Sequence, residues 1–125
     1  MSKESVSMHE MGIAAELWRL CAQREHEHGA RADVVRIAVG ELASVEPALL
    51  ELAWRQIAAA PDGTAPRLEI EFCAARQTCA RCGDVAERQP GTWLRLCPTC
   101  GSALHIAGGD ELDLVEVLYR QARQP

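Results

Sequence analysis

The pattern of hydrophobic and polar positions from Met8 to about His28 repeats with the period of an α-helix. Its apolar stripe holds Ile13, Leu17, Leu20 and Cys21. Ser7 can cap the start of this helix and Gly29 can end it. A second helix is predicted to begin at Pro47, because the first turn of a helix needs no N–H from that residue. Its apolar face holds Leu49, Leu50, Ala53, Trp54 and Ile57.

Three other segments have the composition or the alternation of β-strands. Residues 33–43 are rich in β-branched side chains. Residues 67–73 alternate strictly, which predicts a buried face of Leu68, Ile70 and Phe72. Alternation returns at residues 112–119. This third strand must bury its apolar face, so we expect it to pair with the second strand, with the segment between them inserted.

The inserted segment, residues 74–104, has no such periodicity and carries two Cys-x-x-Cys pairs: Cys79 with Cys82, and Cys97 with Cys100. Two such turns can bring four sulfurs together in a tetrahedron, which suits Zn(II) and leaves no open position for catalysis. The segment is too small to build an apolar core, so the metal would take the place of the core. Iron–sulfur and redox dithiol sites also use this spacing and stay open as alternatives at this point.

These predictions combine into an α+β fold, with a small three-stranded sheet, two helices and an inserted zinc ribbon. Residues 1–73 form the first part of the helix–sheet domain, with 1–7 as an extension ahead of the first helix. Residues 74–104 form the zinc ribbon, and residues 105–125 return the last strand to the first domain.

Composition and charge narrow the possible functions. The 125 residues, 48% of them hydrophobic, are of single-domain size, and their net charge of -5 disfavours bulk binding to nucleic acid or anionic membranes. The apolar runs are too short to span a bilayer. The amino terminus does not read as a secretory signal, so we expect a cytoplasmic protein with reduced thiols. Residues 74–104 carry a local charge of +2, with -7 left for the rest.

Four motifs, in this order and spacing, resemble the HypA/HybF family of hydrogenase maturation proteins, which are nickel chaperones. The resemblance covers nearly the whole chain from Met8 onward. Its matching pieces are Met8-His9-Glu10-Met11, Val39-Gly40-Glu41-Leu42 followed by Val45-Glu46, the two cysteine pairs, and Gly109-Asp110-Glu111-Leu112.

The resemblance implies a non-enzymatic carrier whose Ni(II) site is formed by Met8, His9 and Glu10, helped by Glu46 at the start of the second helix. Imidazole, backbone nitrogen and carboxylate oxygen suit Ni(II). The implied partners are a nickel-insertion GTPase, the hydrogenase large-subunit precursor and urease maturation factors, with no nucleic acid or membrane. The zinc site would be structural.

The sequence departs from the family pattern in two places. Seven residues precede Met8, so a chain that starts at Met1 has no free amine where the family places one. Gly83 and Gly101 follow the cysteine pairs where some relatives carry histidines, so we expect an all-thiolate zinc site.

An alternative function is that of a zinc-ribbon adaptor, which binds nucleic acid or a protein partner through Arg76, Arg81, Arg88 and Arg95. The overall acidity disfavours it. Trp93 is either a cover for the zinc or a contact with a partner. Cys21 and Cys73 are expected to pack as small hydrophobes, and His105 to lie at the surface.

Overall fold

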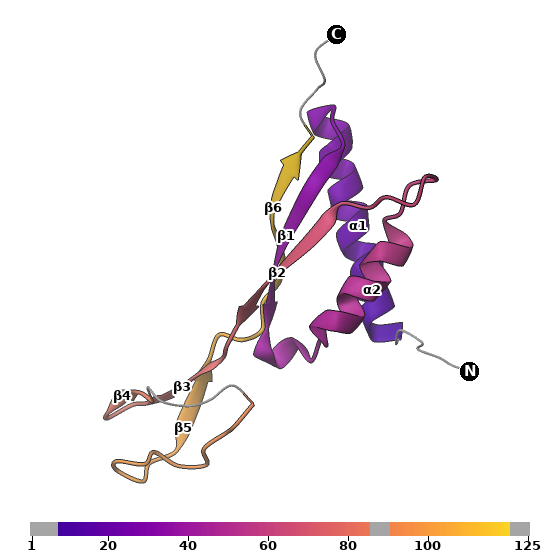
Figure 1. Ribbon diagram of the computed structural model, residues 1–125. Helices are drawn as coiled ribbons and strands as arrows, with labels where there is room; N and C mark the ends of the chain where they lie inside the picture. Colours follow the sequence, from indigo (N-terminus) through magenta and orange to yellow (C-terminus); the bar gives the residue numbers. More distant parts are fainter. Residues whose placement is uncertain (1–7, 86–90, 121–125) are drawn as a thin grey trace, which may run out of the picture. The chain divides into compact units, whose positions relative to one another are not determined.

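The computed structural model describes residues 8–85 and 91–120 (Figure 1). Within these residues the chain forms two compact units. The helix–sheet unit comprises residues 8–38, 45–71 and 113–120, and the cysteine unit comprises residues 39–44, 72–85 and 91–112. No helix of the described part is long and apolar enough to cross a membrane.

Both predicted helices are confirmed: α1 spans Met8–His28 and α2 spans Pro47–Ile57. Gly29, at a φ of 81°, ends α1 by donating its N–H to the carbonyl oxygen of Glu25 at 2.8 Å. The two helices lie side by side (Figure 1), and the rings of Trp18 and Trp54 meet edge to face at 5.8 Å. The predicted cap at Ser7 lies outside the described residues.

The main sheet consists of β1 (Ala32–Gly40), β2 (Arg67–Cys73) and β6 (Leu112–Tyr119), in the order β2-β1-β6. The expectation that the second and third strands pair with each other is wrong, because β1 lies between them. β1 carries the most deeply buried side chains of the three strands, so the central position shields it best. The insertion of the cysteine segment between two strands of one sheet is confirmed.

The two faces of β1 differ in character. Val35, Ile37 and Val39 are fully buried, as their alternation predicts. Arg36 lies on the opposite face, where its guanidinium bridges Glu69 of β2 and Glu116 of β6 at 2.8 Å each. These pairs are solvent-exposed and contribute little stability, but they link all three strands of the sheet.

One strand boundary and the burial of one side chain differ from the sequence expectation. β1 stops at Gly40, and Glu41–Ala43 form the short 3-10 helix η1 instead of extending the strand to residue 43. Ser44 follows at a φ of 58°, a left-handed conformation that no strand can continue through. Phe72 is 51% exposed rather than buried, because β2 leaves the helix–sheet unit after Glu71.

The cysteine unit has a second small sheet in the order β4-β3-β5. Its strands are β3 (Arg76–Cys79), β4 (Gly83–Asp84) and β5 (Leu104–Ala107). β5 pairs antiparallel with β3, so this unit runs beyond the expected end at residue 104. The pairing sets Cys79 opposite Leu104 and holds the first cysteine turn next to the chain that leaves the second.

Candidate metal centres

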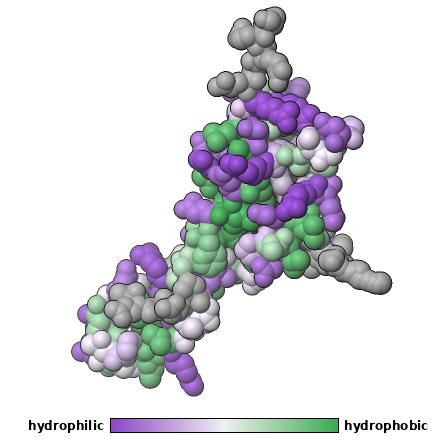
Figure 2. Space-filling view, in the orientation of Figure 1, coloured by the Kyte–Doolittle hydropathy of each residue, from purple (hydrophilic) through white to green (hydrophobic). Residues whose placement is uncertain are grey.

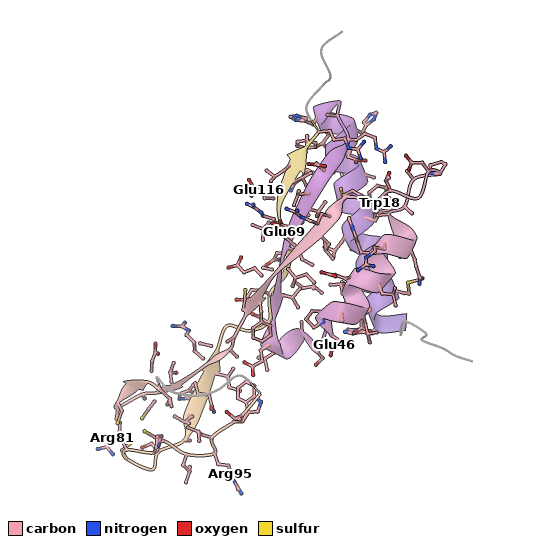
Figure 3. The ribbon with its side chains drawn as sticks, in the orientation of Figure 1. Trp18, Glu46, Glu69, Arg81, Arg95 and Glu116 are labelled. Carbon is pink, nitrogen blue, oxygen red and sulfur yellow. The ribbon has the colours of Figure 1, made fainter. Side chains whose placement is uncertain are left out.

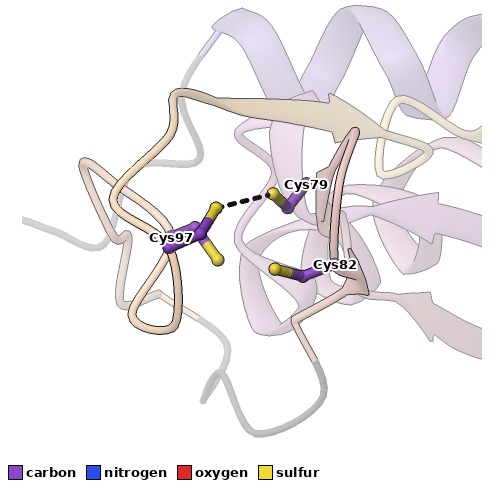
Figure 4. A group of neighbouring side chains, drawn as sticks. Cys79, Cys82 and Cys97 are labelled. Carbon is purple, nitrogen blue, oxygen red and sulfur yellow. Dashed lines mark hydrogen bonds between the residues drawn. The ribbon is translucent and has the colours of Figure 1, made fainter.

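The cysteine unit brings Cys79, Cys82, Cys97 and Cys100 together, with all four sulfurs within 4.8 Å of one another. Figure 4 shows the sulfurs of three of them turned toward a common centre. The Sγ atoms of Cys79 and Cys100 are 3.5 Å apart. Four thiolates around a tetrahedral Zn(II) lie about 3.8 Å from one another, so the arrangement fits zinc. In the described residues no other group of three or more potential metal ligands lies this close.

Each cysteine pair sits in a tight turn that the backbone closes. Gly83 and Gly101 follow the two turns at φ values of 87° and 78°, which only glycine adopts without strain. In the second turn Gly101 donates its N–H to the carbonyl oxygen of Cys97 at 2.9 Å. A histidine at either of these positions would strain the backbone.

The two turns differ in their readiness to lose protons. Ser102, through its hydroxyl and its backbone, lowers the pKa of Cys100 to about 6, and the backbone N–H groups of Cys100 and Thr99 lower the pKa of Cys97. A hydrogen bond shared with Cys100 raises the pKa of Cys82 to about 12. Cys100 therefore offers a thiolate at neutral pH, and an incoming metal releases the protons of the cysteines that still carry them.

The base of the cysteine unit is closed by two glycines that pack against backbone. A Cβ atom on Gly40 would collide with the carbonyl group of Gly109, and one on Gly109 would collide with Ala75. This closeness lets Gly40 donate to the carbonyl oxygen of Glu111 at 2.7 Å, and Leu42 donate to that of Gly109 at 2.6 Å. The Val39-Gly40-Glu41-Leu42 and Gly109-Asp110-Glu111-Leu112 motifs thus form a single junction.

Glu41 and Gln77 hold the unit together with buried or half-buried polar side chains. The Glu41 carboxylate accepts from Ala75 N at 3.0 Å and from Gly91 N at 2.6 Å. The Gln77 amide donates to the carbonyl oxygen of Leu94 at 2.9 Å and accepts from Leu94 N at 3.0 Å. Sequence reasoning gave neither residue a role. Glu41 lies in one of the motifs on which the family resemblance rests, so the sequence could have pointed to it. No neighbouring residue could have pointed to the role of Gln77, because its partner Leu94 is 17 residues away.

The residues expected to bind nickel lie at the starts of the two helices. His9 is exposed in the first turn of α1, and Glu46 is exposed just before α2 (Figure 3). Glu10 is nearly fully buried, and its carboxylate accepts from Glu46 N at 3.2 Å. This bond brings the His9-Glu10 segment and Glu46 together. The side chain of Met8 lies outside the description.

Cys21, Cys73 and His105 have the expected surroundings, with one difference. Cys21 is fully buried in the helix–sheet unit, whereas Cys73 is only half-buried. His105 is exposed, as predicted. His28 stacks on Tyr119 with ring centroids 3.8 Å apart, which commits one face of its imidazole to packing.

Fold and site define a class: a small α+β protein with a four-thiolate zinc ribbon inserted before the last strand of its main sheet. A family model described as "Hydrogenase/urease nickel incorporation, metallochaperone, hypA" matches residues 8–119. The chain therefore belongs to the HypA family of nickel-incorporation metallochaperones, which confirms the resemblance.

Individual relatives agree with the family match. The hydrogenase maturation factor HypA of Deinococcus radiodurans is 36% identical over 109 residues, covering 86% of this chain and 89% of that protein. The HypA protein of Moorella thermoacetica is 34% identical over 96 residues, covering 76% and 83%. The solution structure of the Ni metallochaperone HypA from Helicobacter pylori has a TM-score of 0.57 at 20% identity, over 90% of this chain and 97% of that one. This likeness confirms the fold.

Proposed function

We propose that this chain carries Ni(II) at the joined starts of α1 and α2 and hands it to the precursor of a nickel–iron hydrogenase, while its zinc stays in place. The observation that supports the proposal is the hydrogen bond from Glu46 N to the Glu10 carboxylate, which gathers His9 and Glu46 at one end of the helix pair. Zinc held by four thiolates has no open position, so transfer falls to the other site.

The ligands have different roles in this proposal. His9 supplies an exposed imidazole, and Glu46 supplies an exposed carboxylate. Glu10 contributes its backbone nitrogen and positions Glu46, because its own carboxylate is buried and already accepts a hydrogen bond. Met8 contributes its free amine where the chain begins at that residue. Nitrogen and oxygen donors of this kind suit Ni(II), and a site at the surface can release it.

The proposal also covers the partner proteins and the compartment in which nickel is transferred. The chain works without catalysing a reaction itself, by exchanging ligands with a nickel-insertion GTPase and the hydrogenase large-subunit precursor, and with urease maturation factors where these exist. We place this exchange in the cytoplasm, where a reducing environment keeps cysteines out of disulfides and leaves the four clustered thiols available to zinc.

Calorimetric titration of Ni(II) into the zinc-loaded protein tests the nickel site. His9→Ala should abolish binding with the zinc content unchanged, whereas His105→Ala, which changes an exposed histidine in the cysteine unit, should bind like the wild type. Unchanged nickel affinity in His9→Ala contradicts the assignment. A chain that begins at Met8 should bind nickel more tightly than one that begins at Met1, because it adds an amine ligand.

A further inference from the structure

The cysteine unit exposes large apolar side chains beside its second cysteine turn. Trp93 is 42% exposed, Leu94 39%, Leu96 56% and Ile106 53%. We call these four residues the apolar strip. Scattered apolar residues are normal at a surface, but a contiguous group marks a site of interaction.

The strand pairing makes the apolar strip contiguous. Gln77 stands directly opposite Ile106 in the β3–β5 pair, so both side chains point to the same face of the small sheet. On that face the Gln77 amide bonds to both backbone groups of Leu94. The backbone of Leu94 and the side chain of Ile106 therefore both lie beside Gln77 on this face. Trp93 adjoins Leu94 in the chain, and Leu96 follows at its bridge to Ala103.

The buried side chain of Gln77 holds the apolar strip in place. Gln77 is almost fully buried, and both ends of its amide are satisfied by Leu94 alone. A buried amide would be costly without these bonds, so segment and side chain hold each other in place. Cys97 directly follows Leu96, so the metal site fixes the other end of the segment. A preordered apolar surface loses little conformational entropy on binding.

The charge beside the apolar strip indicates what binds there. Arg95 lies between Leu94 and Leu96 in the chain and is exposed on the cysteine unit with Arg81 (Figure 3). Arg76 is already paired with Asp84 at 3.5 Å, whereas no ion pair engages Arg81 or Arg95 within residues 8–85 and 91–120. Figure 2 shows hydrophobic and hydrophilic residues side by side on this unit. The surface is complementary to a ligand that is both acidic and apolar.

We infer that the apolar strip, with Arg95, is a docking surface for an acidic segment of a partner protein that carries large apolar side chains. Nucleic acid fits less well, because residues 74–104 contain only one aromatic residue for stacking and the whole chain has a net charge of -5. The inference does not depend on nickel binding. It also gives Trp93 the role of a partner contact rather than a cover for the zinc.

An NMR titration of the zinc-loaded full chain tests this inference. The probe is a synthetic peptide that alternates Glu with Leu and Phe. One comparison peptide has Lys in place of Glu, and another has Ser in place of Leu and Phe. The first peptide should shift the amide signals of residues 93–96 and 104–107 and the indole signal of Trp93. The other two should bind at least about tenfold more weakly, since each lacks one of the two complementary features.

Variants locate the binding. Leu96→Ser and Arg95→Glu should each weaken the acidic peptide about tenfold. Val115→Ser and Arg24→Glu are the matched controls in the helix–sheet unit, where Val115 is 54% exposed, and both should bind as the wild type does. Ile106→Ser replaces Leu96→Ser if the latter lowers the zinc content, because Leu96 adjoins Cys97 in the chain whereas Ile106 adjoins no cysteine.

Four results would overturn the inference. They are shifts that map to the helix–sheet unit, equal binding of the lysine peptide, a concentration-dependent dimer that Leu96→Ser breaks in the absence of peptide binding, and retention on single-stranded nucleic acid that Arg95→Glu abolishes. The third result would make a second copy of this chain the occupant, and the fourth would favour the adaptor function.

Discussion

At the scale of single residues, Glu10 shows how burial changes the role of a side chain. A glutamate in the first turn of a helix ordinarily faces solvent and interacts with the helix dipole. Here the carboxylate is buried and accepts from the backbone of Glu46, 36 residues along the chain. The residue next to the exposed His9 therefore joins the two helices.

Replacing Glu10 separates a positioning role from a ligand role. Glu10→Ala removes the acceptor for Glu46 N and should lower the free energy of unfolding by about 1 to 3 kcal/mol and weaken nickel binding. Glu10→Gln keeps an acceptor oxygen and should retain most of both. Urea unfolding followed by circular dichroism, together with nickel titration, measures the two effects. A Glu10→Gln protein that is stable but loses nickel would show that the carboxylate binds the metal directly.

Cys21 makes the stability of the helix–sheet unit depend on pH in the alkaline range. Burial raises the pKa of this thiol from 9.0 to about 11, so the folded protein keeps a proton that the unfolded chain has lost. The stabilisation is complete below pH 9 and disappears as the pH rises toward 11. Cys21→Ala should flatten the fall in stability across this window. Urea unfolding at several pH values measures it, and an equal fall in both proteins would contradict the role of Cys21.

At the scale of the elements, the end of β1 depends on a close backbone approach at Gly40. Gly40→Ala places a Cβ atom against the carbonyl group of Gly109 and should destabilise the protein by about 1 to 3 kcal/mol. Gly12 in α1 has no atom near its added Cβ, so Gly12→Ala should instead stabilise the protein by about 0.5 to 1 kcal/mol. Thermal unfolding of the pair measures both. Equal effects of the two substitutions would contradict the closeness of this junction.

The elements also show which parts of the fold a sequence can predict. The helices follow from a period that local residues carry, so α1 and α2 begin where Met8 and Pro47 predict. The order of the strands does not follow from local residues, because it depends on which strand lies between the other two in the sheet. β5 was missed because Leu104–Ala107 is short and pairs with β3, far away in sequence. The cysteine site follows from spacing alone, whereas the contacts of Gln77, Glu41 and Glu10 join distant segments.

At the scale of the whole molecule, the two units draw their stability from different sources. The helix–sheet unit has an apolar core that includes Leu50, Trp54 and Ile37. In the cysteine unit, few apolar side chains are buried besides two of the cysteines, so metal binding supplies most of its stability. The units should respond differently to loss of metal.

Chelation of zinc tests this division. Stripping the metal should unfold the cysteine unit and leave the helical circular dichroism signal nearly intact, because α1 and α2 both lie in the other unit. The amide signals of residues 76–79 and 104–107 should collapse in NMR spectra, while those of α1 remain. A single cooperative loss of both units on chelation contradicts the prediction.

The central claim is that one chain holds two independent metal sites, a permanent one made of thiolates and an exchangeable one at His9. Native mass spectrometry of the protein titrated with Ni(II) tests it most directly. The wild type should carry one zinc and gain one nickel, His9→Ala should carry zinc alone, and a Cys79→Ser, Cys82→Ser double variant should lose zinc but still gain nickel. Nickel that enters the wild type only by displacing zinc would contradict the claim.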